Sequence, residues 1–86
     1  MARYITKQAE IEAVQWNGEN IEEIDYFAGS NIVYISIPKR LLKVRTAEGI
    51  ITAVTGDYII KDSSGKFYSC KPETFKEKYI LIQQIT

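Results

Sequence analysis

The sequence contains no histidine, and this absence limits the reactions that the chain could catalyse. Histidine is the usual general base near neutral pH, a common metal ligand and the partner of many catalytic serines and cysteines. Carboxylates are present, but a hydrolytic pair must face each other across a cleft that 86 residues seldom build alone. We therefore expect a protein that is not an enzyme and has neither a metal site nor a cofactor.

Cysteine is also scarce, because Cys70 is the single cysteine of the sequence. A disulfide within the chain is therefore impossible, and so is a zinc site made of several thiolates. This composition favours a reducing compartment such as the cytoplasm. Alternation along its predicted strand puts Cys70 on the same sheet face as Tyr68 and opposite Phe67, so we expect a buried structural role for the thiol.

Long apolar runs are missing as well, since no stretch approaches the roughly 18 apolar residues that a membrane-spanning helix requires. Residues 1–7 lack the apolar centre of a signal peptide. We therefore expect no membrane association and a site of action in the compartment of synthesis.

What the sequence does contain is typical of one globular domain, which we assign to residues 1–86. Hydrophobic residues make up 45% and charged residues 26%, and the formal net charge is zero. The charges are unevenly distributed: residues 1–37 hold two basic and six acidic side chains (net −4), and residues 38–86 hold nine basic and five acidic ones (net +4). Such a division indicates a charged partner surface, although charges also cluster by chance in a short chain.

One segment, residues 20–28, has clear helical spacing. Ile21, Ile24 and Phe27 fall on one stripe of this helix, and acidic residues fall on the other side. Asn20 and Glu23 have the spacing of a capping box, and Gly29 follows as the residue that ends the helix. A second, shorter helix is predicted at residues 73–78, with Pro72 in its first turn.

The remaining segments have the period of two that is typical of strands. The predicted strands are residues 10–16, 31–37, 41–47, 50–54, 57–61, 66–70 and 79–85. Because most links between them are too short for a parallel crossover, the sheet should be mainly antiparallel. The sequence therefore predicts an α+β fold, with a curved sheet or small open barrel of about six or seven short strands and one covering helix.

Several segments together resemble a family of small, uncharacterised phage and prophage proteins. These are residues 11–18 (IEAVQWNG), 56–61 (GDYIIK), 65–68 (GKFY) and 70–72 (CKP), followed by Phe75 and Tyr79. The family often has proline where this chain has Thr55 and Ser69, and both changes affect a turn or a strand entry. The resemblance implies a phage or prophage origin, and hence action in the host cytoplasm, but no mechanism.

Five residues are the candidates for contact with a partner or ligand: Trp16, Lys43, Arg45, Tyr68 and Lys71. Tyrosine and tryptophan are enriched at binding interfaces, although these two also suit the edge of a core. Lys43 and Arg45 alternate onto one face of a strand. Joined by an aromatic residue such as Tyr34 or Tyr68, they could stack bases and neutralise phosphates, or they could simply keep a sheet face soluble.

We therefore expect a phage accessory protein that acts by binding to a host or phage protein, in host takeover or against a defence system. The alternative is a binder of single-stranded nucleic acid or of an anionic small molecule, through a basic face that includes Lys43, Arg45 and Lys71. A contact between two copies of the chain is a further interpretation of the aromatic residues.

Overall fold

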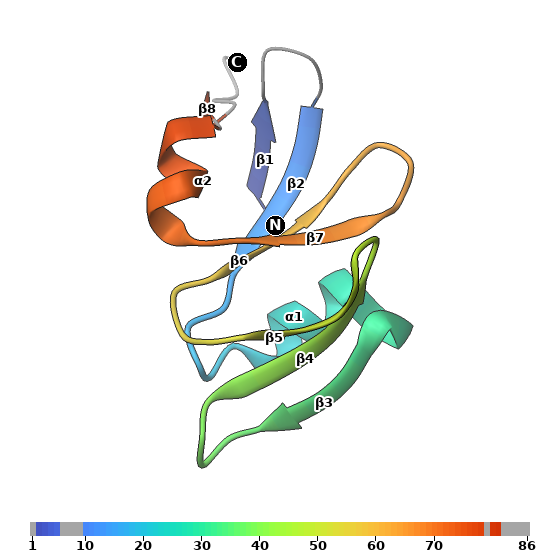
Figure 1. Cartoon of the computed structure of the whole chain (residues 1–86), viewed down its shortest axis with the longest axis vertical. Coiled ribbons are helices and arrows are strands. Elements are labelled where there is room, and N and C mark those ends of the chain that lie inside the picture. The colour runs from blue at the N-terminus through green and yellow to red at the C-terminus, as the bar shows by residue number, and fades with distance from the viewer. Residues whose placement is uncertain (1, 6–9, 79, 82–86) are drawn as a thin grey trace.

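The computed structural model describes residues 2–5, 10–78 and 80–81, and in these ranges the chain forms two antiparallel sheets and two α-helices (Figure 1). The larger sheet has the order β7-β6-β2-β1-β8 and the smaller one the order β3-β4-β5. The strands are β1 (Ala2–Ile5), β2 (Glu10–Gln15), β3 (Ile32–Ser36), β4 (Leu41–Thr46), β5 (Gly49–Ala53), β6 (Tyr58–Lys61), β7 (Phe67–Cys70) and β8 (Ile80–Leu81).

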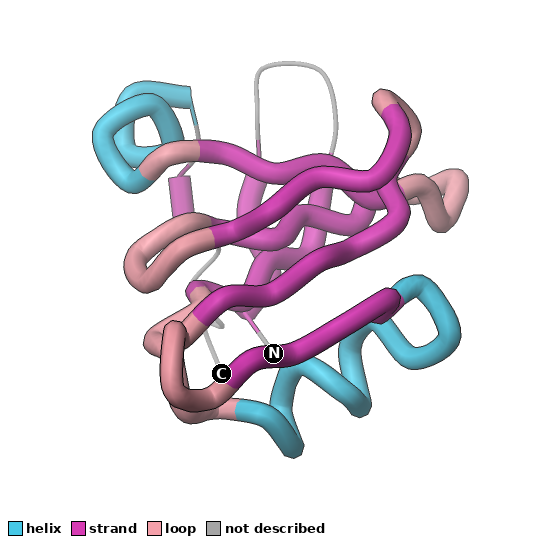
Figure 2. Tube along the Cα trace, turned by 60° about the horizontal axis from the view of Figure 1, so that its bottom comes forward, coloured by secondary structure: helices cyan, strands magenta, loops and turns pink. Residues whose placement is uncertain are grey.

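The helices are α1 (Ile21–Ala28), which continues into the 3₁₀ turn η1 (Gly29–Asn31), and α2 (Pro72–Lys78). Figure 2 shows α1 at the bottom and α2 at the upper left, with strands of both sheets between them. The predicted α+β class and antiparallel pairing are confirmed. The sheet does not close into a barrel, however. The strands form two separate sheets: the three consecutive strands that follow α1 pair with one another, and β2 pairs with β1 and β6 instead.

The two sheets meet at one end, where the tip of the β4–β5 hairpin reaches the start of β7. There the backbone N–H of Ala47 donates to the carbonyl of Phe67 at 2.9 Å. This bond orients one end of the smaller sheet against the larger one. At the other side of the larger sheet, the backbone of Trp16 continues the β2–β6 pairing through bonds with Gly56 and Asp57.

A first hydrophobic cluster fills the space between the two sheets and α1. Its members are Val14, Trp16, Ile24, Phe27, Ala28, Leu42, Val44, Ala53, Ile59 and Phe67. Alternation explains the contribution of β4, where Leu42 and Val44 point inward and Lys43 and Arg45 point outward. Phe27 meets Phe67 edge to face, with ring centroids 5.7 Å apart, which ties α1 to β7.

A second cluster lies on the opposite face of the larger sheet, beneath α2. It contains Ile11, Ala13, Ile60 and Phe75. The middle strand β2 therefore contributes to both clusters, Ile11 and Ala13 to the second and Val14 to the first. Phe75 of α2 stacks on Tyr58, with ring centroids 3.8 Å apart.

The predicted placement of Cys70 relative to its neighbours is confirmed. Tyr68 and Cys70 pack against the second cluster, whereas Phe67 belongs to the first, so successive residues of β7 face opposite ways. The thiol is half-buried rather than fully buried. None of the helices in the described ranges combines the length and the apolar character needed to cross a membrane.

The capping of α1 differs from the prediction. Asn20 occupies the N-cap position, but its side chain makes no cap hydrogen bond to the helix. Instead its amide donates to the Glu23 carboxylate at 2.7 Å and to the carbonyl of Gln15 at 2.9 Å, and its side-chain oxygen accepts from the backbone N–H of Asn17. The side-chain oxygen of Asn17 accepts from the backbone N–H of Asn20 in turn. The turn before the helix therefore takes the bonds that a capping box would use.

The N-terminal strand β1 was not among the predicted strands. The last predicted strand, residues 79–85, is observed as β8 at Ile80–Leu81, and its remaining positions lie outside the described residues. Ile21, predicted on the buried stripe of α1, is 38% exposed, whereas Ile24, Phe27 and Ala28 are buried. It stands at the first position of the helix, where the chain enters from solvent.

Candidate binding surfaces

The smaller sheet has one face toward the first cluster and one face toward solvent. We name the second one the outer face and define it by Tyr34, Lys43, Arg45, Ile50 and Thr52. The register explains this grouping, since Tyr34 pairs with Lys43, Lys43 with Thr52 and Arg45 with Ile50. Residues directly opposite each other in antiparallel strands share a sheet face. Three strands thus converge on one solvated surface.

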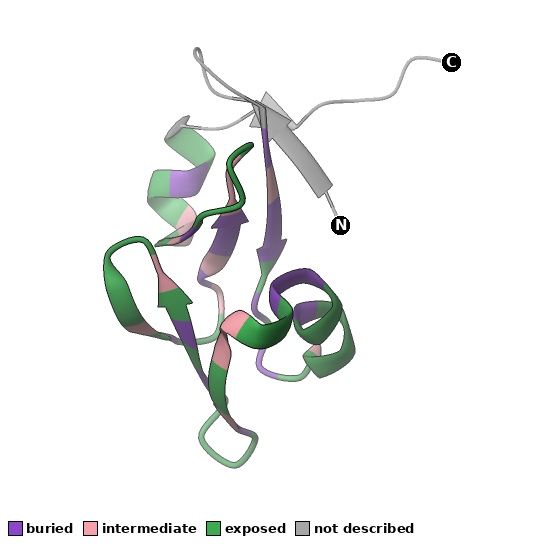
Figure 3. Cartoon of the chain, turned by 90° about the vertical axis from the view of Figure 1, so that its right-hand side faces the viewer, coloured by how far each residue is buried: buried purple, intermediate pink, exposed green. Residues whose placement is uncertain are grey.

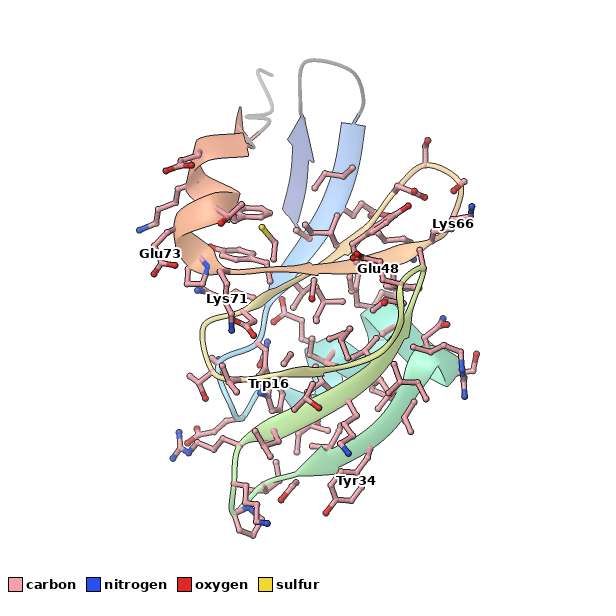
Figure 4. All side chains as sticks on the ribbon, in the orientation of Figure 1. Trp16, Tyr34, Glu48, Lys66, Lys71 and Glu73 are labelled. Atoms are coloured by element: carbon pink, nitrogen blue, oxygen red, sulfur yellow. The ribbon has the colours of Figure 1, made fainter. Side chains whose placement is uncertain are left out.

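The outer face combines exposed apolar groups with unpaired positive charge. Tyr34 is 55% exposed and Ile50 58% exposed, which is high for side chains of this kind. Figure 4 shows Tyr34 on β3 directed away from the body of the molecule. Among the described residues, no carboxylate lies within ion-pair distance of Lys43 or Arg45. The predicted grouping of Lys43, Arg45 and an aromatic residue is therefore observed, and the aromatic residue is Tyr34.

Trp16 is not available to a partner, which corrects its selection as a surface candidate. Its side chain has no exposed area and belongs to the first cluster. The indole N–H donates to the carbonyl of Arg40 at 2.9 Å, so the polar group of the ring is satisfied inside the protein. A tryptophan placed just before a turn is ambiguous in a sequence, and here the turn folds the ring inward.

Arg40, whose carbonyl accepts the bond from the indole, has a left-handed backbone, with φ of 55°. This conformation is uncommon for a residue with a side chain. Its guanidinium lies 3.2 Å from the Glu19 carboxylate, and its Cβ and Cδ face Gly18. The β3–β4 turn is thus fastened to the core by its backbone and to residues 18 and 19 by its side chain.

Lys71 is exposed, but its charge already has a partner. Its ammonium lies 3.2 Å from each carboxylate oxygen of Asp57, a buried residue with 5% exposure. The same carboxylate accepts a bond from the backbone N–H of Val54 at 3.1 Å. Lys71 therefore balances a buried charge, and its removal would leave that charge unpaired. Lys71, which was predicted to contact a ligand, therefore has a structural role in its ion pair with Asp57.

Tyr68 lies on the side of the larger sheet that carries the second cluster, away from the outer face. Partial burial raises the pKa of its hydroxyl, and the nearby carboxylates of Asp62 and Glu48 raise it further. Tyr68 therefore stays protonated and neutral well above neutral pH. The five predicted site residues do not form one site: only Lys43 and Arg45 come together.

The hairpin between β6 and β7 is closed by the side chain of Asp62. One carboxylate oxygen accepts from the Ser64 hydroxyl at 2.6 Å, from the Ser64 backbone N–H at 2.9 Å and from the Lys66 backbone N–H at 3.0 Å. The bonds from the Ser64 hydroxyl and the Lys66 amide, in that order, lower the pKa of this carboxyl below 3.8. These bonds hold Gly65 and Lys66 in a fixed loop.

A pocket of about 280 Å³ lies where this hairpin approaches the β4–β5 hairpin. It is lined by residues 45–47 of one hairpin, residues 65–67 of the other and Asn31 of η1. Figure 3 views the molecule from the side on which η1 and these hairpin ends lie. We name it the hairpin pocket. Its lining includes one predicted residue, Arg45, but neither Tyr68 nor Lys71.

Sequence reasoning did not select Ile50, Lys66 or Asn31. The pairing of Ile50 with Arg45 follows from a two-residue hairpin loop at Ala47 and Glu48, whereas the predicted turn lay one residue later, at Glu48 and Gly49. Lys66 and Asn31 are distant in sequence from each other and from β4. Their approach depends on the packing of two hairpins, for which the sequence has no local signal.

Within the part of the chain that the structure describes, no group of three or more acidic or cysteine side chains is placed to hold a metal ion. No protein-family model matches the chain, and searches of curated proteins and of solved structures found no match either. Any functional proposal therefore depends on the surfaces described above.

Proposed function

We propose that the chain is a phage or prophage accessory protein that acts in the host cytoplasm by non-catalytic binding, and that the outer face docks on a host or phage protein. The observation that carries this proposal is the composition of that face. Two large side chains, Tyr34 and Ile50, are more than half exposed beside two cations that have no acidic partner in the described ranges of the chain. Tyrosine and arginine are enriched at protein interfaces relative to the rest of a protein surface.

The composition of the face also indicates the chemistry of its partner. Lys43 and Arg45 lie on the middle strand β4, and Tyr34 and Ile50 lie on the strands to either side of it. The two cations suit acidic groups on the other protein, because complementary charge guides association and rejects wrong partners, and the flanking side chains suit apolar groups. The partner should therefore present acidic residues with apolar groups beside them. The phage origin rests on the sequence resemblance alone.

Single-stranded nucleic acid is the alternative ligand, and the pairing of Tyr34 with Lys43 favours it. An aromatic ring beside a cation could stack a base and contact its phosphate. The outer face has only one aromatic residue, however, and the chain as a whole has no net charge. Proteins that track a nucleic-acid strand usually combine several stacking residues with a positive field, so we favour the protein partner.

The test is capture from host lysate by the tagged chain and by two matched variants. Ile50→Glu places a negative charge on the outer face, directly opposite Arg45. Ile21→Glu makes the same change at a partly exposed isoleucine on α1, outside that face. We expect the wild type and Ile21→Glu to retain one stoichiometric protein, and Ile50→Glu to lose it.

Nuclease treatment and a salt series complete the experiment. Capture of a protein partner survives nuclease and weakens as salt rises, since charge contributes to it. Retention of the same partner by Ile50→Glu, or loss of all capture on nuclease treatment, contradicts the proposal. Circular dichroism of each variant shows that the change has not unfolded the chain.

A further inference from the structure

The hairpin pocket has walls that are fixed before any ligand arrives. One wall is held by Asp62, which binds the Ser64 and Lys66 amides. The other is held by Thr46, whose hydroxyl donates to the Gly49 carbonyl at 2.6 Å. The bond from Ala47 N–H to Phe67 carbonyl joins the two walls. A site with fixed walls loses little conformational freedom on binding.

Two positively charged side chains, Arg45 and Lys66, contribute to the lining of this pocket. Among the described residues, neither has a carboxylate within ion-pair distance. Glu48 is close in sequence, but Figure 4 shows Glu48 and Lys66 at separate positions around the hairpin tip. Arginine presents a planar set of donors that matches the oxygens of a carboxylate or a phosphate. The charge of the lining therefore favours an oxyanion.

Asn31 contributes a neutral donor to the same lining. Its side-chain amide donates to the carbonyl of Ala28 at 3.3 Å. A primary amide has two N–H groups, so a second donor remains for a ligand. Cationic and neutral donors thus come from three separate segments, β4, the β6–β7 hairpin and η1.

The pocket also has an apolar part, formed by Phe67. This side chain is 6% exposed, and its ring packs edge to face against Phe27. The ammonium of Lys61 lies 5.2 Å from the Phe27 centroid and 5.6 Å from the Phe67 centroid, which fixes both rings further. A volume of about 280 Å³ is small for a ligand site and suits a group the size of a single ring.

We infer that the hairpin pocket binds a small organic oxyanion, a carboxylate or phosphate group carried on a compact apolar body. The anionic group meets Arg45, Lys66 and Asn31, and the apolar body lies against Phe67. This inference goes beyond docking on a protein, because the pocket uses neither Tyr34 nor Ile50. The two sites share Arg45 alone, and each has its own test.

The experiment is an amide NMR titration of the ¹⁵N-labelled chain with three probes of similar shape. Phenyl phosphate and benzoate carry the two kinds of oxyanion, and benzyl alcohol carries none. We expect saturable shifts of the Ala47, Gly65 and Lys66 amides with at least one anion, with dissociation constants of about 1 mM or below. The anion that binds more tightly shows whether the pocket prefers a phosphate or a carboxylate group.

Three variants show which side chains recognise the probe. Arg45→Gln and Lys66→Gln each remove one charge of the lining and should weaken binding about tenfold or more. Lys43→Gln removes another exposed charge from the same strand face as Arg45, outside the lining, and should change the affinity by less than about twofold. All three positions are exposed, and the NMR spectrum of each variant reports whether it is folded.

Two outcomes overturn the inference. The first is the absence of saturable shifts at the pocket amides with both anions, or equal shifts with benzyl alcohol. The second is a loss of affinity in Lys43→Gln as large as that in Arg45→Gln. This result would show that the positive charge of β4 attracts the anion without specific recognition in the pocket. Neither outcome bears on capture of a protein through Ile50.

Discussion

At the scale of single residues, polar side chains in turns determine much of the local structure. Asp62 organises its hairpin through three bonds to one oxygen, and Asp57 joins a buried turn to Lys71. Both act by satisfying backbone or ammonium donors that would otherwise lack an acceptor.

The bonds to Asp62 give a pH-dependent contribution to stability. Because they lower the pKa of the folded state below 3.8, the contribution is present above that value and is lost as the pH falls through the folded pKa. Ser64→Ala removes the largest cause of the shift, so the pKa of Asp62 should rise toward 3.8. The measurement is a ¹³C NMR titration of the carboxyl group.

Ser63→Ala is the matched control for this titration, since Ser63 lies in the same turn and no side-chain bond joins it to Asp62. It should leave the titration midpoint of Asp62 where it is in the wild type. An unchanged midpoint in Ser64→Ala would show that the hydroxyl bond does not hold the carboxylate.

Alanine substitutions at two glycines with positive φ distinguish the cost of backbone strain from the cost of steric crowding. Gly65 has φ of 87° and open space where a Cβ would lie, so Gly65→Ala should cost about 1–2 kcal/mol through strain alone. Gly18 has a similar φ of 89°, but a Cβ there would lie 2.9 Å from Thr55 Oγ1 and 3.2 Å from Arg40 Cβ. Gly18→Ala should therefore cost at least about 1 kcal/mol more. Urea unfolding of both variants measures the difference, and equal costs would contradict it.

At the scale of elements, most of the fold follows from the sequence. Alternation identified β4 because its inward and outward residues differ in polarity, and the stripe in α1 identified its buried residues Ile24 and Phe27. The division into two sheets did not follow, since alternation shows which face is buried but not which strands pair. The irregular register between Ile32 and Tyr34 also has no local signal.

The candidate surfaces were predictable to a smaller extent. Lys43 and Arg45 were placed on one face because a strand period of two requires it. Trp16 was misplaced because a large aromatic residue before a turn suits a core and an interface equally well. Lys71 was misassigned because its partner, Asp57, is 14 residues away and meets it only in the folded chain. Residues brought together by packing remain outside what sequence patterns show.

At the scale of the whole molecule, the first cluster separates two faces of opposite charge. The acidic side chains of α1 are exposed on a helix whose other side packs in that cluster, and β4 covers the same cluster with Leu42 and Val44. The outer face and the acidic side of α1 therefore lie across the core from each other. Acidic residues from the first part of the sequence and basic residues from the second part therefore lie on opposite sides of the first cluster.

The two clusters should unfold together, because β2 belongs to both and the first cluster joins both sheets to α1. We expect one cooperative transition in urea, with coincident curves from far-ultraviolet circular dichroism and from the fluorescence of Trp16. Trp16 reports the first cluster, and circular dichroism reports every helix and strand. Loss of circular dichroism at a lower urea concentration than fluorescence would show that the second cluster opens by itself.

The fastening of the β3–β4 turn also limits how this chain can vary in length. Hairpin tips commonly accept inserted residues, because little of the structure depends on them. An insertion beside Arg40 would move the carbonyl that the Trp16 indole requires and separate the side chain from Glu19. A peptide graft or a new pair of termini is therefore poorly placed next to Arg40. The loop at Ala47 and Glu48 is a better position, provided that the bond between Ala47 and Phe67 is kept.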